Sequence, residues 1–256
     1  MNRRRWPLFL LLLAGCPPRV DVRSVPSPDA TALLAEVDAV DAHLARIQSQ
    51  AKARVDAAGR KGNVQLFVAV SAPASVHLEV LDFFGKPSGV LISDGQRFVM
   101  FASDAGVWQR GAATAENVAR VLPVSLPPDQ LVSMLLGRAP RLSDPAPTLA
   151  VDAQENAFRV TLHEGRRTQQ LWIDPGRKRV LRSQVEGPGG YTLTFSEFED
   201  VQGAPFPRGI AFAGEGAVAL RYTDLRLGEQ PDPSLFTPEP PPGVTVEQIG
   251  SRSSLP

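Results

Sequence analysis

The stretch Asn63-Val64-Gln65-Leu66-Phe67-Val68-Ala69-Val70 carries a branched aliphatic side chain at every second position. A period of two is typical of a β-strand that buries one face. The same spacing returns in residues 76–80, after a break at Ala72-Pro73. Two further apolar runs flank Ser93-Asp94-Gly95-Gln96, whose Asp-Gly pair is a strong hairpin signal. The first half of the chain is therefore predicted to form a meander of antiparallel strands.

A second series of strands is predicted after the Pro-rich connector at residues 141–147. Turns that contain glycine or proline separate most of its apolar runs, which are residues 157–162, 170–173, 179–185, 191–195 and 218–222. We also expect a helical turn at residues 234–236 and a short strand at residues 244–246.

Helices are predicted before the first strand series and between the two series. Residues 29–58 repeat apolar side chains at three- and four-residue spacings, which predicts one long amphipathic helix that packs on its own sheet; a coiled-coil partner is the alternative. Residues 114–122 and 128–136 predict two short helices. The second is apolar on most sides, so we expect it to be buried. Its residues Leu131, Met134 and Leu135 are the candidate lining or lid of an apolar cavity.

These elements predict an α+β fold that is mostly antiparallel β. We expect a half-open, strongly curved β-barrel whose concave face is covered by the long N-terminal helix and the mid-chain helices. One domain should span residues 29–250, followed by a tail at residues 251–256. Periodicity leaves open whether side chains fill the interior or a lipid-sized cavity remains.

The N-terminus has the features of a bacterial lipoprotein. Three arginines precede the apolar run 8–13, and Leu13-Ala14-Gly15-Cys16 completes a lipobox. We predict that residues 1–15 are a signal peptide and that Cys16, the only cysteine, becomes acylated. An ordinary signal peptide with a chance cysteine is the alternative. Residues 16–28 should form an extended, Pro-rich tether.

Composition limits the function classes. The sequence has 27 Lys and Arg residues and 27 Asp and Glu residues. Removal of Arg3, Arg4 and Arg5 with the signal peptide leaves 24 basic residues, so the net charge of the mature chain is about −3. Nucleic acid is therefore not an expected partner. Pro17 is not the aspartate that marks inner-membrane retention in enteric bacteria. We therefore predict attachment to the periplasmic face of the outer membrane.

Catalytic and metal-binding patterns are weak. The three histidines, His43, His77 and His163, lie far apart in the sequence and show no metal-ligand spacing. Glu197 and Glu199 are the nearest approach to a carboxylate pair, but their spacing on a strand suits a solvated sheet face. We predict no enzymatic activity, no metal and no cofactor.

Several short segments together resemble LolB, the outer-membrane lipoprotein receptor, and its soluble carrier LolA. In addition to the lipobox and the long first helix, they are Asp82-Phe83-Phe84-Gly85, Leu126-Pro127-Pro128-Asp129-Gln130-Leu131 and Phe206-Pro207-Arg208-Gly209-Ile210. The resemblance implies a half-open barrel whose concavity binds acyl chains of other lipoproteins, receives them from a periplasmic carrier and aids their insertion into the outer membrane.

The resemblance also implies roles for individual residues. Phe84, with its neighbour Phe83, best matches a leucine that protrudes from an early turn of the receptor and serves membrane insertion. The carrier's early-strand arginine, which helps to close a lid, has no match here, because the corresponding strand offers only His77. Since adjacent strand residues point to opposite faces, we expect at most one of the two phenylalanines to enter the core. The alternative function is a structural or assembly lipoprotein with a filled core and no ligand.

Overall fold

The computed structural model describes residues 20–57, 60–102, 106–119, 122–240 and 242–250. Most of these residues lie in one sheet, in which 14 strands are described. The strands are β1 (Arg46–Ala57), β2 (Arg60–Ser71), β3 (Ser75–Leu81), β4 (Pro87–Ser93), β5 (Arg97–Ala102), β6 (Val107–Ala112), β7 (Thr148–Asp152), β8 (Ala157–Glu164), β9 (Arg167–Ile173), β10 (Val180–Glu186), β11 (Tyr191–Val201), β12 (Ala204–Ala213), β13 (Ala217–Leu227) and β14 (Val246–Ile249). The helical elements are η1 (Val22–Ser24), α1 (Ala30–Asp41), α2 (Ala115–Ala119), α3 (Pro128–Leu135) and η2 (Pro233–Phe236).

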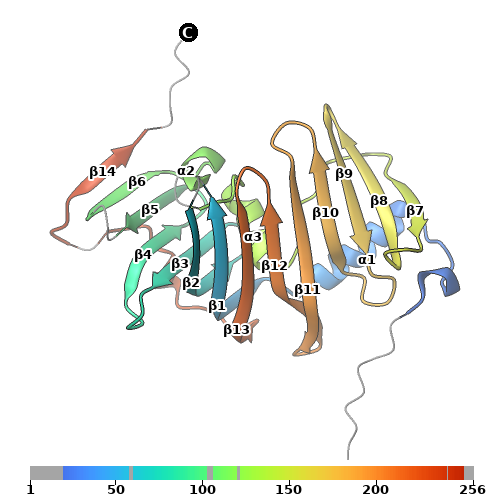
Figure 1. The fold of residues 1–256 in the computed structure, drawn as a ribbon, viewed down its shortest axis with the longest axis horizontal. Helices are drawn as coiled ribbons and strands as arrows, with labels where there is room; N and C mark the ends of the chain where they lie inside the picture. The colour runs from blue at the N-terminus through green and yellow to red at the C-terminus, as the bar shows by residue number, and fades with distance from the viewer. Residues whose placement is uncertain (1–19, 58–59, 103–105, 120–121, 241, 251–256) are drawn as a thin grey trace, which may run out of the picture.

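The two predicted strand series are halves of a single sheet. Its strand order is β14-β6-β5-β4-β3-β2-β1-β13-β12-β11-β10-β9-β8-β7, so β1 joins the halves by pairing with both β2 and β13. All pairs are antiparallel except β14 with β6, which is parallel. The sheet curls but stays open, with β14 and β7 at its edges (Figure 1). The predicted half-open barrel is therefore confirmed only as an open, curled sheet.

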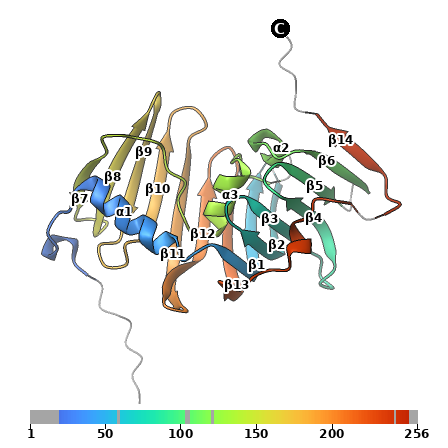
Figure 2. The same cartoon turned by 180° about the vertical axis from the view of Figure 1, so that it is seen from behind.

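The helices α1 and α3 lie on the same side of this sheet (Figure 2). The Asp29 side chain caps α1 by accepting hydrogen bonds from the amides of Thr31 and Ala32. The apolar face of α1 is buried through Leu33 and Val37, over the half of the sheet that contains β8 to β11. The helix α3 packs against β2 and β3 in the other half.

The long N-terminal helix predicted for residues 29–58 is wrong. The helix α1 ends at Asp41, and residues 46–57 form β1. In β1, alternate residues are buried, namely Ile47, Ser49, Ala51 and Ala53. Ser49 and Ala53 are not strongly apolar, so they hid the period of two, while the remaining apolar residues also fitted a helical spacing.

The tether predicted for residues 16–28 is also shorter than expected. Val22 is buried, its amide donates to Asn156 Oδ1 at 2.9 Å, and Asn156 Nδ2 donates to the Val20 carbonyl at 2.8 Å. These contacts hold residues 20–24 against the turn between β7 and β8. Cys16 and the lipobox lie outside the described residues.

Two strands of the second half, β7 and β12, are not among the strands predicted from the sequence. Within β12, only residues 206–210 are named there, as part of the resemblance. β7 is short and largely exposed at the edge of the sheet. At the other edge, the C-terminal segment returns across the outer face, where η2 contacts β3 and β4, before β14 pairs with β6. No helix in the described ranges is long and apolar enough to cross a membrane.

Candidate functional site

The strands β1, β3 and β5 end, and β2, β4 and β6 begin, at one end of the sheet, because the strands from β1 to β6 pair as an antiparallel meander. At this end the inner face of the sheet is apolar and only half-buried. We call this surface the mouth; its residues are Val55, Val64, Leu66, Val80 and Val218.

The strand register makes the mouth a continuous surface. Leu66 lies opposite Val80 on β3, and Val55 lies opposite Val218 on β13. Further from the turns, the same face becomes buried, as at Val68 and Leu78. The apolar core therefore extends to the solvent at this end of the sheet instead of being sealed by polar side chains.

The turn between β3 and β4 exposes two aromatic rings beside the mouth. Phe83 is 95% exposed and Phe84 is 82% exposed. Their rings contact each other edge to face, with 5.5 Å between centroids. Neither ring enters the core, within the expectation that at most one would, because both residues follow Leu81, where β3 ends.

The backbone of this turn is held firmly although its rings are exposed. Asp82 Oδ1 accepts hydrogen bonds from the amides of Phe84 and Lys86, both at 2.8 Å. Gly85 has a φ of +75°, a conformation that costs glycine little. The structure thus presents two large apolar side chains on an ordered turn; their role in membrane insertion stays a prediction.

The three residues predicted to line or cover a cavity lie together on α3 and in the core. Leu131, Met134 and Leu135 are 1%, 4% and 3% exposed. The Tyr222 hydroxyl donates to the Leu135 carbonyl at 2.7 Å, and burial raises the pKa of that tyrosine. The helix is therefore fixed inside the curled sheet, and these side chains do not reach the surface of the mouth.

A buried ion pair holds the end of α1. The Arg179 guanidinium, in the turn before β10, is 1% exposed; it pairs with Asp41 and donates to the Gly137 carbonyl at 2.5 Å. Burial raises the pKa of Asp41 to about 6, against the lowering effects of Arg179, Arg138 and Arg141. Sequence reasoning missed this cluster because its members are far apart in the chain.

No protein-family model and no curated protein matches the sequence. Among solved structures, a LolA superfamily protein from Nitrosomonas europaea matches with a TM-score of 0.55 and 16% identity, over 82% of this chain and 98% of that chain. The chain has a LolA-like fold. The resemblance that the sequence suggested is confirmed at this level.

Two further structures share the LolA-like fold with this chain. One is a domain from Vibrio parahaemolyticus described as an outer membrane lipoprotein-sorting protein, with a TM-score of 0.50 and 11% identity over 81% of this chain and 97% of that chain. The other is a DUF1329 family protein from Desulfovibrio piger, with a TM-score of 0.53 and 10% identity over 81% of this chain and 95% of that chain.

Within the LolA-like fold, His77 cannot serve a lid on the inner face. Its side chain is on the outer face, where Nδ1 lies 2.6 Å from the Leu235 carbonyl oxygen and Nε2 lies 2.8 Å from Glu79 Oε1. His77 therefore links β3 to the C-terminal segment. On the inner side of the sheet, Arg179 pairs with Asp41 at the end of α1, and Arg141 pairs with Asp38 of the same helix.

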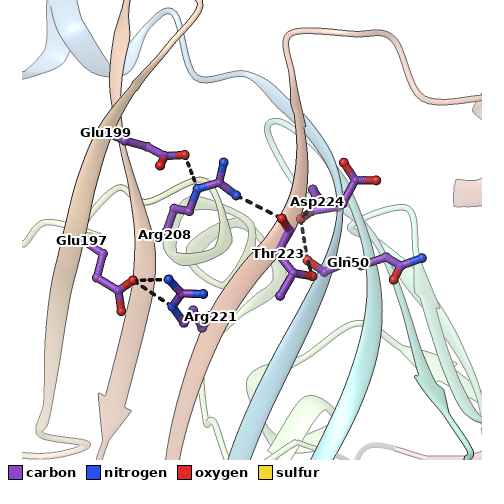
Figure 3. Close-up of polar contacts among 8 residues, drawn as sticks. Gln50, Glu197, Glu199, Arg208, Arg221, Thr223 and Asp224 are labelled. Atoms are coloured by element: carbon purple, nitrogen blue, oxygen red, sulfur yellow. Dashed lines mark hydrogen bonds and ion pairs between the residues drawn. The ribbon is translucent and has the colours of Figure 1, made fainter. Parts of the chain in front are cut away.

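The carboxylates Glu197 and Glu199 form cross-strand ion pairs on the outer face (Figure 3). Glu197 accepts from Arg221 Nε at 2.8 Å, and Glu199 pairs with Arg208. Exposed pairs of this kind contribute about 0–1 kcal/mol. In the described part of the chain, no group of three or more His, Cys, Asp or Glu residues is placed to hold a metal ion.

Proposed function

We propose that this protein is an envelope lipoprotein that binds the acyl chains of other lipoproteins and aids their insertion into the outer membrane. The acylated Cys16 anchors it to the periplasmic face of that membrane, and a soluble periplasmic carrier is the expected donor of the cargo. We assign no chemical reaction and no cofactor to the protein.

The observation that carries the proposal is the half-buried apolar surface of the mouth beside the exposed ring pair Phe83 and Phe84. A lipid site needs apolar lining with few polar groups, which the residues of the mouth supply. Large exposed aromatic side chains on an ordered turn lose solvent contact when they enter the acyl boundary of a bilayer. The LolA-like fold of a domain described as lipoprotein-sorting supports the same conclusion.

The second candidate is a structural or assembly lipoprotein with a filled core. The observation in its favour is α3, because burial of Leu131, Met134 and Leu135 fills the space between this helix and the sheet. The two candidates differ in one measurable property, since only the first binds acyl chains.

Replacing Phe84 with glutamate tests the role of the turn. Because the ring is already exposed, the change should leave the free energy of unfolding within about 0.5 kcal/mol of the unmodified protein. Transfer of a fluorescent lipoprotein from the carrier to liposomes should slow by about tenfold or more, because a carboxylate resists entry into the bilayer. Val151→Glu is the matched control, since Val151 is an exposed apolar residue on β7, the edge strand furthest from β3 and β4 in the sheet order.

Replacing Val64 with glutamate tests the mouth itself. The change places a charge on the apolar surface, and native mass spectrometry of the protein mixed with a diacylated lipopeptide should show much less bound lipopeptide than with the unmodified chain. If the unmodified chain binds no lipopeptide, the filled-core candidate replaces the proposal. Full transfer by a stably folded Phe84→Glu variant would remove only the role of the turn.

A further inference from the structure

The outer side of the mouth has a pocket whose polar lining can donate hydrogen bonds. It lies at the hairpin of β1 and β2, has a volume of about 320 Å³, and is lined by Arg54, Lys61, Gly62 and Asn63. Arg54 lies opposite Asn63 in the strand register, so both side chains project from the outer face while Val55 projects into the mouth. A guanidinium, an ammonium and an amide around one pocket favour an anion.

The charges near this pocket differ in how far they are neutralised. Lys61 pairs with Asp56 at 2.9 Å, whereas Arg54 has no ion-pair partner among the described residues. The Asp82 carboxylate is engaged by the amides of its own turn. Arg54 therefore offers a guanidinium whose charge is available to a ligand.

The pocket and the aromatic turn lie at the same end of two adjacent strands, β2 and β3. Gln65 of β2 is opposite Leu81, the last residue of β3, so β2 continues past the end of β3 through residues 60–63. The turn with Phe83 and Phe84 starts at that same point. The anion-favouring pocket and the two exposed rings consequently occupy the same end of adjacent strands.

We propose that this pocket binds the phosphate of an anionic phospholipid while Phe83 and Phe84 enter the acyl region of the same bilayer. The arrangement suits a bilayer surface better than a free anion, because a phospholipid presents its phosphate directly above an apolar layer, and the protein presents a pocket lined by Arg54 at the same end of the sheet as two exposed apolar rings. The sequence has equal numbers of acidic and basic residues, so attraction to an anionic membrane depends on where the cations lie. The inference deepens the proposed function by naming the lipid class that the mouth meets.

Vesicle binding by the full chain carrying Cys16→Ser, which lacks an acyl anchor of its own, tests the inference. We expect co-sedimentation with vesicles of phosphatidylcholine and phosphatidylglycerol to exceed that with phosphatidylcholine alone, and to weaken as salt is raised. Arg54→Ala should lower the affinity for the anionic vesicles about fivefold, and Arg54→Glu should lower it further.

Arg226 provides the matched control. It is an exposed arginine on the outer face of β13, lies opposite Gln48 towards the other end of β1, and has no ion-pair partner among the described residues. Arg226→Ala and Arg226→Glu should leave vesicle binding unchanged. Equal losses for Arg54 and Arg226 variants, or equal binding to both vesicle types, would overturn the inference.

Lipopeptide binding by the same unlipidated chain, measured without vesicles, separates this inference from the proposed function. If the chain binds lipopeptide but shows no preference for anionic vesicles, only the headgroup pocket is refuted. If the vesicle preference depends on Arg54 while no lipopeptide binds, the pocket stands and the acyl-chain function fails. Retention of the unmodified melting temperature by each variant excludes misfolding as the cause of a loss.

Discussion

At the scale of single residues, Arg179 and Asp41 decide how the end of α1 is attached to the sheet. Arg179 is almost completely buried, and its only described acidic partner is Asp41. Buried pairs are strongly destabilising when one partner is removed, because the remaining charge stays in a low-dielectric environment. Replacing Arg179 with Met should therefore destabilise the protein at neutral pH, by about 3–5 kcal/mol, because the Asp41 carboxylate then loses its buried partner.

The raised pKa of Asp41 also predicts a pH dependence. The folded protein holds the Asp41 proton up to about pH 6, whereas the unfolded chain releases it near the ordinary aspartate pKa of 3.8. Between these two values the folded state binds more protons, so the free energy of unfolding should fall as pH rises, by up to about 3 kcal/mol. Urea denaturation from pH 4 to 7, compared with Asp41→Asn, measures this contribution. If the free energies of unfolding of the two proteins differ by the same amount at every pH from 4 to 7, Asp41 does not cause the pH dependence.

At the scale of elements, α3 and the turn between β3 and β4 have opposite relations to solvent. Residues 128–136 are apolar on most sides, and most side chains of α3 are buried where the helix packs against β2 and β3. The aromatic turn is also strongly apolar, yet its rings are exposed. The difference follows from position: α3 lies against the inner face of β2 and β3, whereas the turn projects beyond the last paired residue of β3.

For α3 we predict a large loss of stability on truncation of a core side chain. Leu135→Ala removes buried methyl groups and leaves a cavity, so the free energy of unfolding should fall by about 2–5 kcal/mol. Gln130→Ala, at a half-buried polar position of the same helix, should change it by less than about 1 kcal/mol. Thermal or urea denaturation of both variants measures the contrast. An unaltered melting temperature for Leu135→Ala would show that α3 opens as a gate.

At the scale of the whole molecule, the N-terminal segment and the mouth occupy different ends of the sheet. Val20 and Val22 contact Asn156 in the turn between β7 and β8, at the β7 edge. In the strand register this turn is at the end opposite to the turns of the mouth. The anchor proposed at Cys16 therefore enters the domain away from the surface proposed to receive cargo.

The anchor itself gives a prediction at this scale. Because Cys16 is the sole cysteine and completes the lipobox, Cys16→Ser should prevent acylation and leave the protein either uncleaved or released from the membrane. Membrane fractionation with mass measurement of the chain checks both outcomes. A mature-sized Cys16→Ser protein that stays firmly in the outer membrane would refute lipidation at this residue.

Local features of the chain followed from the sequence by itself. The period of two in residues 63–70, the Asp-Gly turn at Gly95 and the apolar helix at 128–136 were predicted because each depends on neighbours within a few residues. The mostly antiparallel pairing of the strands followed from the same alternation. The exposure of Phe84 was favoured on sequence grounds, since large apolar residues at a turn are difficult to bury.

Only the tertiary structure decided the features that join distant segments. Residues 46–57 fit both a helical and a strand spacing, and pairing with β2 and β13 selects the strand, because β1 then has a partner on each side. Arg179 meets Asp41, which is 138 positions away in the chain, and the C-terminal β14 pairs with β6. The mouth likewise combines side chains from β1, β2, β3 and β13. Local periodicity reports which face of an element is apolar, but which elements share that face depends on long-range pairing that no short stretch of sequence specifies.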